Sequence, residues 1–227
     1  MIRSRFQQGL DDLKERLLEM GGMCEAAIEL ASEAYRTRNG RLAQQVFERE
    51  KMINQSQRLI DELAVDLLAM QQPMASDLRF VLAVVKINSD LERVGDLAVH
   101  VAQRSLDLSQ EPELEVPVDI GRMTTAVSAM LRRALESFLA AKAEVAQAVL
   151  EMDSIVDRMK DEAFVNLVAQ MKSDPERVRA YIDVLLITRS LERIADHATN
   201  IAEDVIFWVS GADVRHNARF GMGPEGD

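Results

Sequence analysis

An internal duplication constrains this chain more than any other feature of its 227 residues. Residues 91–96 read LERVGD and residues 191–196 read LERIAD, and Arg79, Ala98 and Ala102 recur at the same offset of 100. Upstream, AQQVFERE from Ala43 matches AQAVLEMD from Ala146 with an offset of 103. A loop three residues shorter in the second copy reconciles the two offsets. The chain therefore contains two copies of one structural unit.

Each copy is predicted to be a three-helix bundle. Only 4% of the residues are aromatic, which disfavours strands, and the abundant Ala, Leu and Met favour helices. Six helices are predicted, over roughly 5–37, 41–70, 75–109, 117–141, 143–172 and 175–210. Breaks lie at Asn39-Gly40, at Gln72-Pro73 and at Ser173-Asp174-Pro175, and SQEPELEVP links the two copies. The predicted fold is all-α, with two tandem duplicated bundles at 1–110 and 117–210 and a loosely held, glycine-rich tail at 211–227.

The last predicted helix carries an apolar seam and an acidic row. Heptad spacing places on the seam Leu191, Ile194, Ala198, Ile201, Val205 and Trp208. Since each residue advances ~100° around a helix, Glu192 and Asp196 fall on the far side, and Asn200 and then Glu203 or Asp204 continue the row. The first copy has Glu92, Asp96 and His100. The preceding helices add Asp153 with Asp157 and, in the first copy, Glu50 with Asn54.

Two interpretations of these acidic rows stay open. Arg189 stands three residues before Glu192, and Arg193 three before Asp196, so the rows are either a solvated face with ion pairs worth ~0.2–0.5 kcal/mol each or a surface metal site. Oxygen donors suit Mg²⁺, Mn²⁺, Fe or Ca²⁺. The rows point outward and lack Glu-x-x-His spacing, which disfavours an oxygen-activating di-iron enzyme. Phosphate-binding loops, nucleophile elbows and zinc-protease motifs are also absent from the sequence.

Charge and hydropathy limit the classes of partner and compartment. The net charge of −11 argues against nucleic acid as a partner and leaves room for cations or basic protein surfaces. The N-terminus lacks the apolar core of a signal peptide, and no stretch approaches the ~20 apolar residues of a membrane span. We therefore expect a cytoplasmic protein that reaches the membrane only through partners. Cys24, the single cysteine, is expected to be a packed thiol.

Four stretches span both copies, in order along the chain. They are MGGM at 20–23, QPMASDLR at 72–79, LERVGD at 91–96 and RSLERIADHATNIAEDVIFWVSGADVRH at 189–216. Together they resemble the PhoU family of phosphate-transport accessory proteins. The resemblance implies two tandem three-helix bundles and a non-enzymatic negative regulator of the phosphate-starvation response and of phosphate uptake. It further implies an adaptor between the ATPase subunit of the phosphate ABC transporter and a membrane sensor histidine kinase.

The resemblance also implies a surface metal, Fe, Mn or Mg, and no organic cofactor. Carried over by position, the metal ligands are Glu92, Asp96, Asp153, Asp157, Glu192, Asp196, Asn200 and Asp204. The first copy has Asn54 where the second has Asp157, and His100 where the second has Asn200, so the second site is favoured. The long Ala-rich bundle surface suggests a homodimer. The alternatives are a surface-metal-dependent enzyme, a phosphatase or ferroxidase-like protein, and a purely structural helical scaffold.

Overall fold

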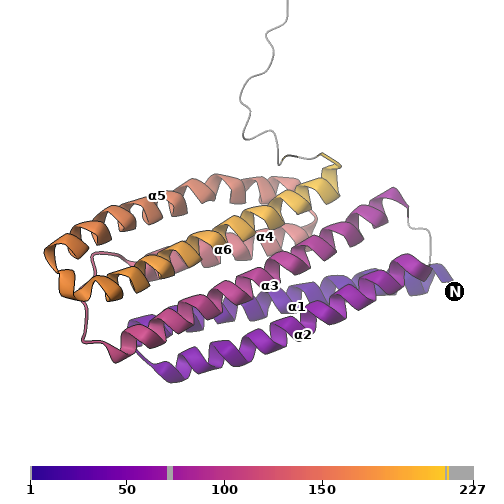
Figure 1. Cartoon of the computed structure of the whole chain (residues 1–227). Coiled ribbons are helices and arrows are strands. Elements are labelled where there is room, and N and C mark those ends of the chain that lie inside the picture. The colour runs from indigo at the N-terminus through magenta and orange to yellow at the C-terminus, as the bar shows by residue number, and fades with distance from the viewer. Residues whose placement is uncertain (1, 71–73, 213, 215–227) are drawn as a thin grey trace, which may run out of the picture.

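Six α-helices form two three-helix units in the computed structural model, which describes residues 2–70, 74–212 and 214. The first unit contains α1 (Ile2–Thr37), α2 (Gly40–Met70) and α3 (Ala75–Gln110). The second contains α4 (Ile120–Ala140), α5 (Ala143–Ser173), a 3₁₀ turn η1 (Pro175–Arg177) and α6 (Val178–Ser210). The described residues include no strand. Figure 1 shows the two units lying against each other along their length, which confirms the predicted all-α fold.

The helix boundaries depart from prediction at two places in the second unit. The helix expected from residue 117 begins at Ile120, because Asp119 is its N-cap and its side chain accepts a hydrogen bond from the Arg122 backbone N–H at 2.8 Å. Pro175 opens the 3₁₀ turn η1, and the α-helix begins only at Val178. The break predicted at Gln72-Pro73 and most of the predicted tail, residues 213 and 215–227, lie outside the described residues.

The predicted seam of α6 is buried. Five of its members are at most 1% exposed, namely Leu191, Ile194, Ala198, Ile201 and Val205. Trp208, at the end of the seam, is partly buried and meets the ring of Phe80 in a T-shaped contact with centroids 5.0 Å apart. This edge-to-face geometry is a favourable one for aromatic pairs. The heptad pattern therefore identified the buried face of α6 correctly.

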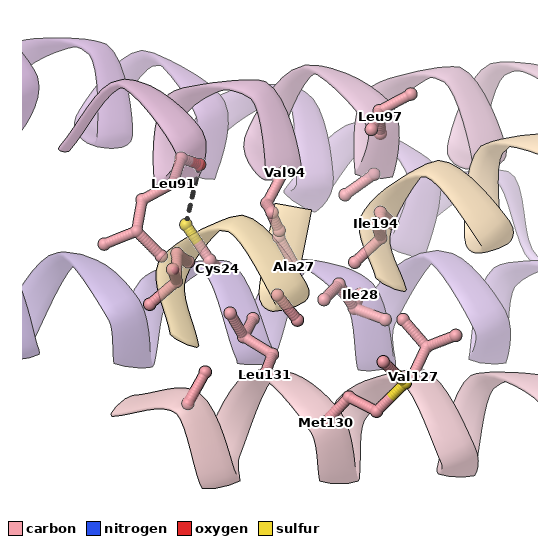
Figure 2. Close-up of a cluster of buried hydrophobic side chains, with 14 of the residues drawn as sticks. Cys24, Ala27, Ile28, Leu91, Val94, Leu97, Val127, Met130, Leu131 and Ile194 are labelled. Carbon is pink, nitrogen blue, oxygen red and sulfur yellow. Dashed lines mark hydrogen bonds between the residues drawn. The ribbon is translucent and has the colours of Figure 1, made fainter. Parts of the chain in front are cut away.

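The two units share a single hydrophobic core. α1 and α3 of the first unit pack against α4 and α6 of the second, and Figure 2 shows Ile28, Val94, Leu131 and Ile194 from these four helices meeting in one cluster. Cys24 belongs to this cluster: its thiol donates to the Leu91 carbonyl at 3.2 Å, and burial raises its pKa well above the usual value. The single cysteine is thus a packed thiol, as expected.

α3 and α6 form the central contact between the units and run antiparallel. Lys86 near the start of α3 pairs with Asp204 near the end of α6, with Nζ and Oδ1 3.0 Å apart. At the other end Arg104 Nη1 lies 3.0 Å from Asp183 Oδ1. The duplicated helices thereby face each other around an approximate two-fold axis (Figure 1). Among the described residues, no helix combines the length and the apolar character needed to cross a membrane.

Candidate functional site

Four carboxylates from adjacent helices gather in the second unit. Asp153 and Asp157 lie on α5, and Glu192 and Asp196 lie on α6, which packs beside it. We call these four residues the α5–α6 acidic cluster. The Lys160 ammonium lies among them, with Nζ 3.2 Å from Glu192 Oε1 and 3.7 Å from Asp157 Oδ1. The predicted approach of the two acidic pairs is therefore found, together with a cation that the sequence reading did not place there.

Partial burial and the neighbouring negative charges raise the pKa values of two carboxyl groups in this cluster, Asp153 and Asp196. Partial burial, followed by the negative charges of Glu192, Asp153 and Asp157, raises the pKa of Asp196 from 3.8 to about 6. Partial burial and the charges of Asp157 and Glu192 also raise the pKa of Asp153. Lys160 offsets only part of this repulsion. The cluster thus holds an excess of negative charge at neutral pH.

The first unit has a smaller counterpart, the α2–α3 acidic cluster of Glu50, Asn54, Glu92 and Asp96. Asn54 donates a side-chain hydrogen bond to Glu50 on the same helix. Arg93 Nε lies 3.5 Å from Glu92 Oε2, and Arg93 Nη1 lies 3.5 Å from Asp96 Oδ2. Partial burial and the charges of Asp96 and Glu50 raise the pKa of Glu92. This cluster carries fewer carboxylates, as the Asn54 substitution implied.

Two predicted members of the row on α6 lie elsewhere. The Asn200 amide donates to Asp90 Oδ1 on α3 at 3.2 Å, and the Asp204 carboxylate is buried against Lys86. The reason is helical geometry, because ~100° per residue turns positions eight and twelve residues after Glu192 by about 80° and 120° away from it. Only Glu192 and Asp196 of α6 therefore face the acidic pair on α5.

A polar contact between the two clusters was not predicted from the sequence. His197 Nδ1 lies 2.7 Å from Asp90 Oδ1, and both side chains are largely buried. A positive charge on His197 would lower the pKa values of both Glu92 and Asp196, so the imidazole lies close to both acidic clusters. Asp90 replaces the serine found at the same position of the second repeat, and this difference between copies was the available signal.

The acidic clusters have the donor chemistry of a hard-cation site but not its arrangement. Carboxylate oxygens are the preferred ligands of Mg²⁺, Mn²⁺ and Ca²⁺. In the part of the chain that the structure describes, however, no three Asp, Glu, His or Cys side chains converge to hold a metal ion as they stand. A cation at the α5–α6 cluster would have to displace Lys160 and draw the carboxylates together.

Comparison with known proteins identifies the relatives of this chain. The pattern of the PhoU domain matches residues 17–105 and 120–205, one match in each unit. A protein of Pseudomonas aeruginosa named phosphate-specific transport system accessory protein PhoU homolog is 41% identical over 95% of this chain and 89% of its own length. A Pseudomonas putida protein of the same name is 40% identical over 95% and 84%.

Solved structures agree with the sequence relatives. The crystal structure of PhoU from Pseudomonas aeruginosa superposes with a TM-score of 0.87 at 40% identity, covering 91% of this chain and all of that one. The phosphate transport system regulatory protein PhoU from Streptococcus pneumoniae gives 0.86 at 28% identity, covering 92% and 99%. Repeat pattern, fold and both comparisons lead to the same conclusion: the chain belongs to the PhoU family and is related to accessory proteins of phosphate transport.

Proposed function

We propose that this protein is a cytoplasmic negative regulator of the phosphate-starvation response and of phosphate uptake. It acts as an adaptor between the ATPase subunit of a phosphate ABC transporter and a membrane sensor histidine kinase. The observation that carries the proposal is the similarity over 95% of the chain to a protein named as an accessory of phosphate-specific transport. The similarity to a Streptococcus pneumoniae protein named as a phosphate transport system regulatory protein supports the same role.

The surface chemistry of the chain suits an adaptor. An adaptor works by presenting surfaces, and the two acidic clusters present carboxylates that attract either a cation or a basic protein surface. Phe164 and Val165 are exposed on α5, and exposed apolar side chains that join into a patch mark interaction surfaces. We include a homodimer in the proposal. Light scattering coupled to size-exclusion chromatography measures the mass directly, and a mass of 25.5 kDa would exclude the dimer.

We further propose that the acidic clusters take up Mn²⁺, Fe or Mg²⁺. Partial burial and then the neighbouring negative charges raise the pKa values of Asp153 and Asp196, and a bound cation would relieve the repulsion between these charges. Binding to the folded chain alone would stabilise it by mass action, by ~2.7 kcal/mol at a hundredfold excess over Kd. The α5–α6 cluster is the stronger candidate because it contributes four carboxylates.

The regulatory role is tested by deleting the gene and following a phosphate-starvation reporter in phosphate-rich medium. Constitutive expression of the reporter, restored to repression by the wild-type chain, supports the adaptor. A reporter that stays repressed in the deletion strain contradicts it. Metal-dependent turnover of a phosphate ester or of Fe²⁺ by the purified protein would instead favour a surface-metal enzyme. A double variant Glu192→Gln, Asp196→Asn in the complementation shows whether repression needs the acidic cluster.

A further inference from the structure

A groove lies between the C-terminal half of α3 and the N-terminal half of α6. Its volume is ≈ 390 Å³, within the range of small-molecule sites. Leu97 and Leu186 contribute apolar lining. The remaining lining is polar, and half of it is cationic, namely Arg104, Arg189 and Arg193 beside His100, Gln103 and Ser190. This concentration of positive charge contrasts with the net charge of −11 for the whole chain.

The three arginines of the groove differ in their partners. Arg104 is held in place, since its Nη1 lies 3.0 Å from Asp183 Oδ1 and 3.2 Å from Asp107 Oδ2. Arg189 and Arg193 are exposed, and neither has an ion-pair or hydrogen-bond partner among the residues that the structure describes. Residues four apart are neighbours on one helix face. Two unpaired guanidinium groups therefore lie next to each other along one side of the groove.

The other repeat shows that the duplication does not require this charge. Arg93, the equivalent of Arg193, turns to Glu92 and Asp96 instead. The positions equivalent to Arg104, Arg189 and Ser190 carry Asp204, Ser89 and Asp90. The approximate two-fold axis thus relates a cationic groove to a region that carries carboxylates. The cationic groove is a property of one side of the α3–α6 pair, and helix packing does not explain it.

We propose that this groove binds a small multivalent phosphate oxyanion, either free orthophosphate or the phosphate groups of a polyphosphate or phosphate ester. A guanidinium group presents a planar fork of donors that matches phosphate oxygens, and such charge-assisted hydrogen bonds are strong. The volume restricts the ligand to a small molecule, and the negative charge of the whole chain opposes extended nucleic acid. The inference goes beyond the regulatory role and does not rest on it.

Isothermal titration calorimetry of the purified full chain tests the groove. Orthophosphate, tripolyphosphate and ATP are titrated at constant ionic strength with a chelator present, so that no cation bridges phosphate to the acidic clusters. We expect at least one probe to bind the wild-type chain. The double variant Arg189→Gln, Arg193→Gln should weaken that binding by roughly tenfold or more. Arg93→Gln is the matched control, since it removes an equivalent arginine outside the groove and should leave the affinity unchanged.

The outcomes separate the sources of the oxyanion. Tighter binding of orthophosphate identifies free phosphate, and tighter binding of tripolyphosphate or ATP identifies a phosphate chain. Absence of binding by all three probes at millimolar concentration overturns the proposal, as does an equal loss of affinity in Arg93→Gln. Arg189 and Arg193 are both exposed, so the double variant should keep its helical circular dichroism. If it does not, Arg193→Gln alone replaces it. The reporter experiment is independent of this measurement.

Discussion

Replacing Asp196 with asparagine should stabilise the protein at neutral pH. The folded chain raises the pKa of this carboxyl from 3.8 to about 6, so folding disfavours its ionised form. A pKa difference of one corresponds to ~1.4 kcal/mol, and the difference between 3.8 and about 6 sets an upper bound of ~3 kcal/mol on the combined cost of partial burial and repulsion. Asp196 keeps substantial contact with solvent, and solvent screening reduces the expected gain to about 1 kcal/mol.

The pH dependence follows from the same shift. A carboxyl whose pKa is higher in the folded chain contributes stability below its unfolded pKa, and this contribution is lost as the pH rises through about 6. Asparagine cannot ionise, so the variant keeps that stability at all pH values. The gain of Asp196→Asn should therefore be present at pH 7.5 and absent near pH 3.5.

Urea unfolding at a series of pH values, in a chelator, measures this difference. A gain of about 1 kcal/mol corresponds to a rise in Tm of about 2–4 °C for a chain of this size. Asp96→Asn is the matched control, because the equivalent carboxylate faces Arg93 Nη1 at 3.5 Å and its loss should give no gain. Equal or lower stability of Asp196→Asn at pH 7.5, or a gain that persists at pH 3.5, would refute the electrostatic reasoning.

Three further predictions concern the metal, the contact between the units and the core. Mn²⁺ or Mg²⁺ should raise the Tm of the metal-free protein, and the double variant Glu192→Gln, Asp196→Asn should lose that rise while keeping its helical circular dichroism; an unchanged response in the variant excludes the site. Asp204→Asn should keep the metal response. It should lower the free energy of unfolding by about 1–3 kcal/mol, because it breaks the ion pair with Lys86 on α3. Loss of the metal response in this variant would show that Asp204 is a metal ligand after all. Gly21→Leu should cost about 1–3 kcal/mol in urea unfolding, since a Cβ at Gly21 would lie 2.6 Å from Leu135 Cδ1; wild-type stability would show that α1 and α4 are less tightly packed there.

The fold was predictable because the sequence contains two copies of the same helical pattern. The offset between LERVGD and LERIAD identified the repeat, and heptad spacing identified the buried face of α6. Helix boundaries were less predictable where a capping residue starts the helix later than the apolar periodicity indicates. Asp119, the N-cap of α4, is the example. The sharing of one core by both units was not predicted, since periodicity shows which face is apolar but not which helix covers it.

The candidate site was predictable only as far as helical periodicity reaches. Glu192 and Asp196 are four residues apart and stay on one face, whereas Asp204 has rotated to the junction between the units. The place of Lys160 among the carboxylates and the contact of Asp90 with His197 depend on how neighbouring helices are set against each other. Such distances between helices depend on tertiary packing, and the periodicity of a single sequence does not predict them.

The antiparallel pairing of α3 with α6 has a consequence for the origin of the chain. A single three-helix unit would leave the apolar faces of its first and third helices exposed, since these faces are covered here by the other unit. Two identical units related by a two-fold axis would cover them mutually, which is the geometry of an isologous dimer. Duplication and fusion of a gene that encodes such a dimer would produce the present architecture. The two copies then differ on either side of the axis, since Arg104 and Arg189 have Asp204 and Ser89 as their equivalents.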